Sequence, residues 1–157
     1  MASDARLRAG GAILDLEPRR PEWGVEEGPE GPRFLIRGYD SMPPFLMSLV
    51  SESAHWLFLS SCGALAAGRV EPDGALFPYY TDDRIHESAD LTGSKTILRV
   101  RACGATFLWE PFSSRYAGAY RIQRTLRKSA FGHEAEFEEI NEDLGLSFSY
   151  SWTTSAR

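Results

Sequence analysis

A chain of 157 residues can bury one hydrophobic core but not two, so we expect a single folded domain. Its 43% hydrophobic and 25% charged residues exclude a disordered chain, and a net charge of −5 disfavours nucleic acid as a partner. No apolar run approaches the roughly 18 residues of a membrane-spanning helix. We therefore expect a cytoplasmic protein that binds neither membrane nor nucleic acid.

The segment 17–33 is rich in residues that interrupt regular structure, with four prolines and three glycines. Proline opposes helix and cannot donate a ladder hydrogen bond, and glycine marks turns. These residues predict an irregular lead-in over 1–32, with one short strand at 12–17. The pattern changes at Phe34, so we place the folded domain at 33–157.

Three short apolar runs follow the lead-in, at 33–38, 45–51 and 55–61. Each is rich in aromatic and aliphatic residues and is bounded by Gly, Pro or Ser, which is typical of strands. Tight turns are predicted at 62–63, 72–74 and 103–104, because glycine tolerates the positive φ that hairpins need.

The clearest alternation lies in the last third of the chain. Every second position of 144–152 is apolar, and 120–127 shows the same pattern. A period of two predicts strands with one buried and one solvated face. The segment between them continues as a strand through Phe137 and turns at 141–145. Because arginine and leucine also favour helix, a helix over 119–131 is the open alternative.

These elements together predict an all-β fold, an antiparallel β-sandwich with little helix. The strand at 144–152 would need a partner on its free edge, since unpaired edges invite association. Either this strand lies inside the sheet, or the chain is a fragment of a longer protein.

Several groups that could carry chemistry are better explained by the fold. Cys62 and Cys103 are expected to be free thiols in or beside turns, because two cysteines alone cannot complete a tetrahedral metal site. The basic run 121–128 alternates between two faces, which favours cross-strand pairs with the acids of 134–143 over an anion site. The tryptophans of apolar strands are expected in the core rather than on a sugar platform: Trp56, Trp109 and Trp152.

The stretch 75–90 packs two tyrosines, four acids and a histidine into sixteen positions. Asp82 and Asp83 could serve acid–base chemistry, but neighbours on an extended chain point to opposite sides. With His86 and Glu87 they could bind a metal, although the spacing matches no calcium loop or zinc motif. We therefore predict no catalytic residue, metal or cofactor here.

Two interpretations of the same stretch remain. Tyr79 and Tyr80 offer flat apolar faces with hydroxyls, while Asp82 and Asp83 accept hydrogen bonds, as in a sugar-binding lip. The favoured alternative is ordinary strand-end structure, in which Leu76, Pro78 and Tyr80 pack inward. The four residues of the lip are the candidate ligand-binding site.

The segments "SSCGALAAGR…ALFPYYTDD" and "EINEDLGLSFSYSW" carry a resemblance to a known group. Residues 34–157 resemble the N-terminal region of bacterial proteins that are cellobiose-phosphorylase-like or six-hairpin glycosidase-like. The resemblance implies a β-supersandwich domain whose parent protein keeps its catalytic acid downstream, in an (α/α) barrel. No catalytic carboxylate or phosphate-binding residue of the family can be placed within these residues.

The resemblance thus implies a domain without activity of its own, from a glycoside hydrolase- or phosphorylase-like protein. Its expected partner is the catalytic barrel of the same or a neighbouring chain, whose mouth it would shape through the loop 79–83, with a homodimer contact as another role. We then expect exposed apolar surface where the barrel docks. The alternatives are a stand-alone carbohydrate-binding module using exposed aromatics, and a small enzyme around Asp82, Asp83 and His86.

Overall fold

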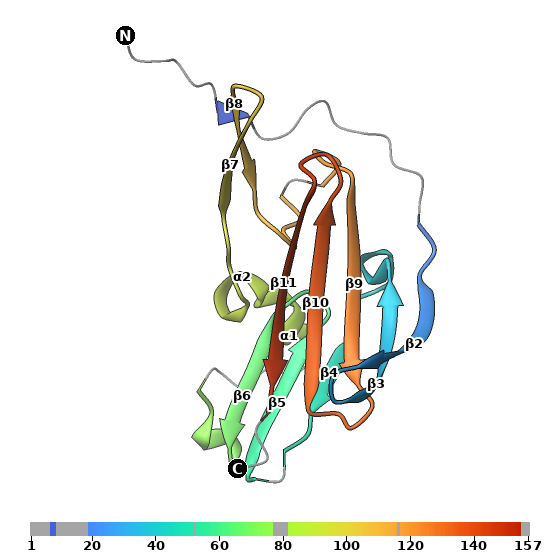
Figure 1. The fold of residues 1–157 in the computed structure, drawn as a ribbon. Coiled ribbons are helices and arrows are strands. Elements are labelled where there is room, and N and C mark those ends of the chain that lie inside the picture. Colours follow the sequence, from blue (N-terminus) through green and yellow to red (C-terminus); the bar gives the residue numbers. More distant parts are fainter. Residues whose placement is uncertain (1–6, 9–18, 52, 77–81, 116, 155–157) are drawn as a thin grey trace.

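The computed structural model describes residues 7–8, 19–51, 53–76, 82–115 and 117–154. Strands dominate these residues and the helices are short (Figure 1). In chain order the elements are β1 (Leu7–Arg8), β2 (Glu22–Gly28), β3 (Gly31–Arg37), η1 (Tyr39–Ser41), β4 (Leu46–Leu49), β5 (His55–Ser60), β6 (Leu65–Arg69), η2 (Pro72–Gly74), α1 (Asp82–Glu87), α2 (Ala89–Thr92), β7 (Leu98–Ala102), β8 (Ala105–Trp109), β9 (Ile122–Ser129), β10 (Glu134–Asn141) and β11 (Leu146–Thr153). The all-β sandwich prediction is confirmed.

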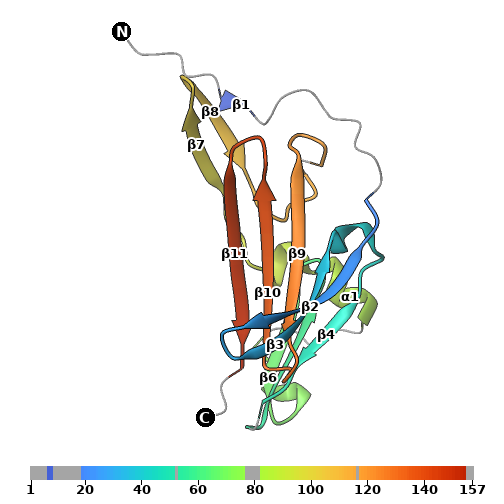
Figure 2. The ribbon, with the colours of Figure 1, turned by 45° about the vertical axis from the view of Figure 1, so that its right-hand side comes forward.

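The main sheet has the strand order β11-β10-β9-β3-β2, and all of its neighbouring strands run antiparallel. β9, β10 and β11 form a meander of long strands, and the β2–β3 hairpin joins it through β3 (Figures 1 and 2). Alternation gives the sheet an apolar inner face and a charged outer face. Phe137 in β10 points inward, for example, whereas Glu136 and Glu138 point outward.

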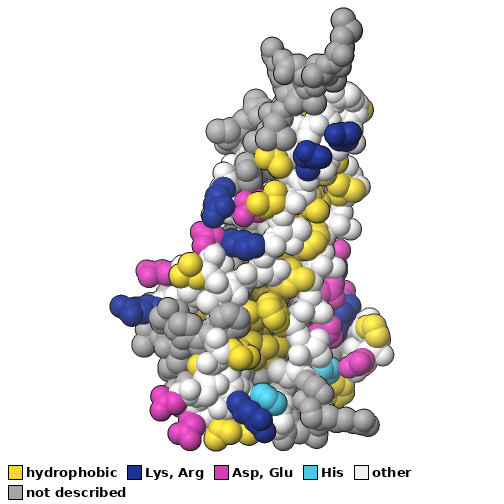
Figure 3. All heavy atoms as spheres, turned by 90° about the vertical axis from the view of Figure 1, so that its left-hand side faces the viewer, with side chains coloured by type: hydrophobic (Ala, Val, Ile, Leu, Met, Phe, Trp, Pro, Cys, Tyr) yellow, Lys and Arg dark blue, Asp and Glu magenta, His cyan; other side chains and the backbone are white. Residues whose placement is uncertain are grey.

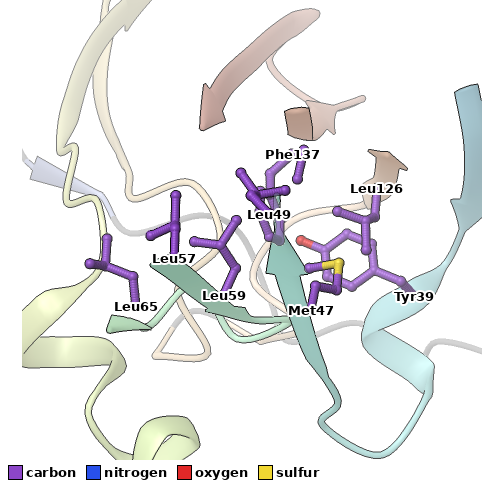
Figure 4. Close-up of a cluster of buried hydrophobic side chains, with 9 residues drawn as sticks. Tyr39, Met47, Leu49, Leu57, Leu59, Leu65, Leu126 and Phe137 are labelled. Carbon is purple, nitrogen blue, oxygen red and sulfur yellow. The ribbon is translucent and has the colours of Figure 1, made fainter. Parts of the chain in front are cut away.

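A second sheet, β4-β5-β6, covers the inner face. Alternate residues of its strands pack with Leu126 and Phe137 of the main sheet, and they form the core shown in Figure 4. Leu59 and Leu65 are almost completely buried there. Burial of each such side chain contributes about 1.5–3 kcal/mol, so this interface is the main source of stability.

The opposite face of the second sheet is covered as well. Ile85 of α1 packs against Ala64 and Ala66, with Trp56 and Phe58 beside them. β5 is therefore covered on both faces, which explains why its sequence is a nearly continuous apolar run. Trp56 lies opposite Gly68, and a Cβ there would stand 2.2 Å from the indole, so only glycine lets the ring lie flat on β6.

The β7–β8 hairpin extends past the end of the main sheet, and β1 pairs with β8 in parallel (Figure 2). Its turn lies at the predicted place, with positive φ at both Cys103 and Gly104. Such a pair of residues is what a type I′ hairpin requires. Near its base the hairpin is anchored by Trp109, whose side chain is buried.

The structure corrects the sequence predictions in several places. Residues 22–28 are a regular strand and not part of an irregular lead-in, because the prolines lie outside β2. Residues 82–92 form two short helices that were not predicted. The helix alternative over 119–131 is wrong, since β9 pairs on both sides, and the expected strand at 12–17 lies outside the described residues.

The predicted turn at 72–74 is a single 3₁₀ turn, η2. It returns the chain to β6 through one bridge, between Gly68 and Ala75, and through a hydrogen bond from the Leu76 amide to the Ala67 carbonyl. A full hairpin strand does not follow within the described residues.

Candidate functional site

A cavity of about 530 Å³ lies between the inner face of the main sheet and the helical segment 82–92. Its wall combines η1, the β5–β6 turn, α1, α2, the loop 112–115 and the central strands of the main sheet. Aromatic rings and charged groups of both signs face it: Tyr39, Asp40, His86, Asp90, Lys95, Phe112, Arg115, Arg124 and Tyr150.

A buried ion pair adjoins this cavity through Arg124. Glu139 of β10 lies opposite Arg124 of β9, and Arg124 Nε donates to Glu139 Oε2 at 2.8 Å. The same carboxylate accepts from Trp109 Nε1 and from the Phe112 amide, each at 2.7 Å. Glu139 therefore ties the base of the β7–β8 hairpin and the following loop to the main sheet.

The surroundings of Arg124 keep it charged. Burial alone would lower its pKa, but the Glu139 carboxylate and the nearby Asp40 raise the pKa of the guanidinium above its usual range. Arg124 Nη2 also donates to the Ser113 carbonyl at 3.2 Å. Its positive charge is thus held in place at the cavity wall by neighbours from three segments.

Two tyrosine side chains that face the cavity have strongly raised pKa values. Burial raises the pKa of Tyr39 well above its usual range, although the Arg124 charge opposes this. Burial likewise raises the pKa of Tyr150. Both phenols are neutral hydroxyl groups at physiological pH, so they can only donate or accept ordinary hydrogen bonds.

Phe112 stands at the centre of the aromatic wall in an unusual backbone conformation. Its φ is 64°, in the left-handed region that costs a bulky residue roughly 1–2 kcal/mol. The hydrogen bond to Glu139 and edge-to-face contacts with three rings hold it there: Phe137, Phe148 and Tyr150. Strained residues held in this way are enriched at functional sites.

The rim of the cavity carries compensated charges. Lys95 donates to Asp90, Arg115 Nη2 lies 3.3 Å from Asp90, and Arg115 Nη1 lies 3.6 Å from buried Glu110. The hydrogen bond from Lys95, followed by the Lys95 and Arg115 charges, lowers the pKa of Asp90. Neither sign of charge dominates the opening.

His86 connects the helical segment to the β5–β6 turn. Its Nδ1 lies 2.6 Å from Ser60 Oγ, and Ser60 Oγ also accepts from the Cys62 amide at 3.0 Å. Because Ser60 is fully buried, it orients the imidazole and cannot act as a nucleophile. Cys62 and Cys103 are both free thiols, as predicted.

The structure describes only part of the predicted sugar-binding lip. Tyr79 and Tyr80 lie outside the described residues, and Asp82 and Asp83 are the first two residues of α1, whose own side chains are not described. The strand-end interpretation is wrong for Leu76, which is 81% exposed. The later part of the same stretch reaches the cavity, since His86, Glu87 and Asp90 line it.

Sequence reasoning missed the buried pair. The acids of β10 were expected on a solvated strand, and the cross-strand pairs with the arginines are confirmed, yet Glu139 is buried. The signal was present: Glu139 shares its alternation with Ala135 and Phe137, both of which are core residues. Trp109 is core as predicted, while Trp56 and Trp152 are partly buried against the core clusters.

A second feature is an exposed apolar face on the β2–β3 hairpin, which we define as Trp23, Val25 and Phe34. Their side chains are 66%, 65% and 56% exposed. They line a groove of about 510 Å³ together with Ile36 and Leu126, so the face continues directly into the core. Lys128 lies at its border, where partial burial lowers the pKa of the ammonium group.

Comparisons with known proteins add no identity. A scan of protein-family models and a search of curated proteins both find no match to this sequence. Among the described residues, no helix is long and apolar enough to cross a membrane, and no three His, Cys, Asp or Glu side chains are grouped to hold a metal ion.

Proposed function

We propose that this chain is a non-catalytic β-sandwich domain of a glycoside hydrolase- or phosphorylase-like protein, and that it docks on a catalytic (α/α) barrel. The observation that carries the proposal is the exposed apolar face of the β2–β3 hairpin. Large exposed apolar side chains that adjoin each other and the core are typical of interaction sites. The family resemblance of 34–157 supplies the kind of partner.

The geometry of this face suits a helical partner. Val25 and Phe34 are directly opposed across β2 and β3, and Trp23 lies next to them on the same face. These three side chains project beside the apolar groove at Ile36, and the side chains of a helix can pack into that groove. Burying each exposed residue would contribute about 1.5–3 kcal/mol, enough for stable docking when several act together.

The test is binding to a barrel domain encoded at the same genetic locus. We expect this chain and the barrel to co-elute in size-exclusion chromatography, and Phe34→Ser or Trp23→Ser to abolish co-elution. Leu91→Ser is the matched control, because Leu91 is also an exposed apolar residue, but on α2. A complex that survives both face variants, or a locus without a barrel, would overturn the proposal.

The cavity favours a second function, a stand-alone carbohydrate-binding module. Phe112 and Tyr150 provide ring surface. The ion pairs of Arg115 and Arg124 offer hydrogen-bond donors and acceptors, and because their charges compensate each other, the site does not require a charged ligand. Concave sites that combine ring surface with a few polar groups commonly bind small ligands, and rings with hydroxyl and charged neighbours suit the apolar faces and hydroxyls of a sugar.

Calorimetric titration of the folded chain against a panel of mono- and oligosaccharides tests this second function. Arg115→Ala at the rim should weaken binding, as should Tyr79→Ala or Tyr80→Ala if the predicted lip contributes. Arg99→Ala on the exposed part of β7 is the control and should leave binding unchanged. The absence of heat with every sugar would exclude the module without affecting the docking proposal.

A further inference from the structure

The last strand of the main sheet has a free edge. β11 lies at the end of the strand order, and the pairing shown for the described residues is with β10 alone. All eight residues of β11 are paired with β10, so the strand is long and regular. In Figure 1 its free side faces left, and Figure 3 shows that side of the molecule, with a stripe of hydrophobic side chains down its middle.

The hydrogen-bond pattern identifies the groups at this edge. The Thr154 amide donates to the His133 carbonyl at 2.9 Å, which makes these two residues a hydrogen-bonded pair in the β10–β11 register. Hydrogen-bonded pairs alternate in antiparallel sheets, so the even-numbered residues of β11 bond to β10. The odd-numbered residues therefore direct their amide and carbonyl groups outward: Ser147, Ser149, Ser151 and Thr153.

This edge lacks the features that normally prevent strand pairing. Natural edge strands are usually short, or carry lysine, proline or a bulge. β11 has the sequence LSFSYSWT, without any charge or proline, and it pairs with β10 without a bulge. The four residues that present the outward groups are all exposed. The outward backbone groups are thus open to another strand.

We propose that two copies of this chain pair through β11, antiparallel across a two-fold axis near Ser149 and Tyr150. A second copy fits because an antiparallel pair of identical strands keeps each face together: serines meet serines on the outer face, and aromatic residues meet aromatic residues on the inner face. No like charges are opposed, since β11 carries none. The result is one continuous sheet running through both copies.

The pairing also continues the core across the axis. Phe148, Tyr150 and Trp152 are only partly buried in the single chain, and Leu146 is 38% exposed. In the pair, these side chains would lie beside those of the second copy. About six new backbone hydrogen bonds and the added apolar contact would stabilise the dimer.

Sedimentation of the intact chain over about a hundredfold concentration range tests the proposal, because a dimer must dissociate on dilution. Ser149→Pro removes an outward amide and leaves the bonds to β10 in place, and Ser149→Lys brings two positive charges to the axis. Each should weaken the dimer by about tenfold or more. Ser149→Thr is the control and should remain dimeric.

Amide hydrogen exchange gives a second measurement, which does not depend on a variant folding. At high concentration the amides of Ser147, Ser149 and Ser151 should become protected, while those of Tyr150 and Trp152 should be protected at every concentration. A chain that stays monomeric throughout, or a dimer without protection at the three serines, would overturn the proposal. A dimer that is lost in Phe34→Ser but kept in Ser149→Pro would place the contact on the apolar face instead.

Discussion

Two arginines on β9 show how differently the two faces of the main sheet use the same chemistry. Arg124 and Arg127 point to opposite faces, and both pair with glutamates of β10. On the inner face the Glu139 side chain is only 2% exposed and has one arginine partner. On the outer face Arg127 shares three carboxylates, each about one quarter exposed: Glu26, Glu136 and Glu138.

The difference follows from what surrounds each charge. Water can replace a lost partner on the outer face, so each ion pair there contributes little. On the inner face the Glu139 carboxylate is almost completely buried, and an unpartnered charge there is strongly unfavourable. The inner pair also orders β8 and the loop at Phe112 through the other bonds of Glu139. The inner pair is therefore essential for the arrangement of the cavity, and the outer network is not.

The largest effect is expected from breaking the inner pair. Arg124→Met leaves the Glu139 carboxylate buried without its cation, and we expect the free energy of unfolding to fall by about 3–5 kcal/mol. Urea unfolding followed by circular dichroism measures it. Arg127→Met is the matched control on the outer face of the same strand, and equal losses in the two variants would contradict the distinction between the faces.

The second prediction concerns the pH dependence of stability, which two buried tyrosines of the inner face should dominate at high pH. The pKa values of Tyr39 and Tyr150 are raised by burial, so their contribution to stability is complete below the ordinary pKa of a phenol, about 10, and is lost as the pH rises above it. Stability should fall by about 1.4 kcal/mol per pH unit for each phenol once the unfolded chain ionises.

Urea unfolding between about pH 9 and 12 measures this loss. Tyr150→Phe removes one of the two ionisations and should make the decline less steep than in the unsubstituted chain. An identical pH dependence in both proteins would show that Tyr150 ionises freely in the folded state.

Breaking the outer network should have a smaller effect. Arg127→Met keeps an apolar stem opposite buried Leu35 and removes only the charge. We expect a loss of about 1 kcal/mol or less, and a smaller loss at high salt because exposed pairs are screened. Unfolding in low and high sodium chloride measures it, and a loss as large as that of Arg124→Met would mean that this face is also sealed from water.

The strands of the main sheet differ in how well the sequence predicts them. Alternation is a local signal, so β9, β10 and β11 were predictable, and position 139 could have been recognised as inward-facing. The strand β2 was missed because prolines were counted as breakers, although Pro21 precedes the strand and Pro29 lies in the turn that follows. Breakers at the ends of a strand delimit it rather than prevent it.

The site was less predictable than the strands. The cavity brings together residues from η1 to β11, and no spacing in the sequence reports such distant contacts. The helices α1 and α2 are too short to show a helical period, and Ser88 makes no side-chain cap bond to the start of α2. What placed His86 at the cavity was the packing of Ile85 on the second sheet, which is a tertiary effect.

The smallest effect is expected at a pair of charges on the surface, Arg121 and Asp143. Asp143 accepts from the Arg121 amide at 2.8 Å and from Arg121 Nε at 2.7 Å, and these bonds lower its pKa. A lowered pKa gives stability that is present above the ordinary value of about 4 and is lost as the pH falls through the folded-state value. Since the pair is exposed to water, Asp143→Asn should cost less than about 1 kcal/mol at neutral pH and nothing in strong acid. Unfolding free energies of Asp143→Asn and of the unsubstituted chain that stay parallel from neutral to strongly acid pH would mean that solvent screening removes even the bond from the Arg121 amide to Asp143.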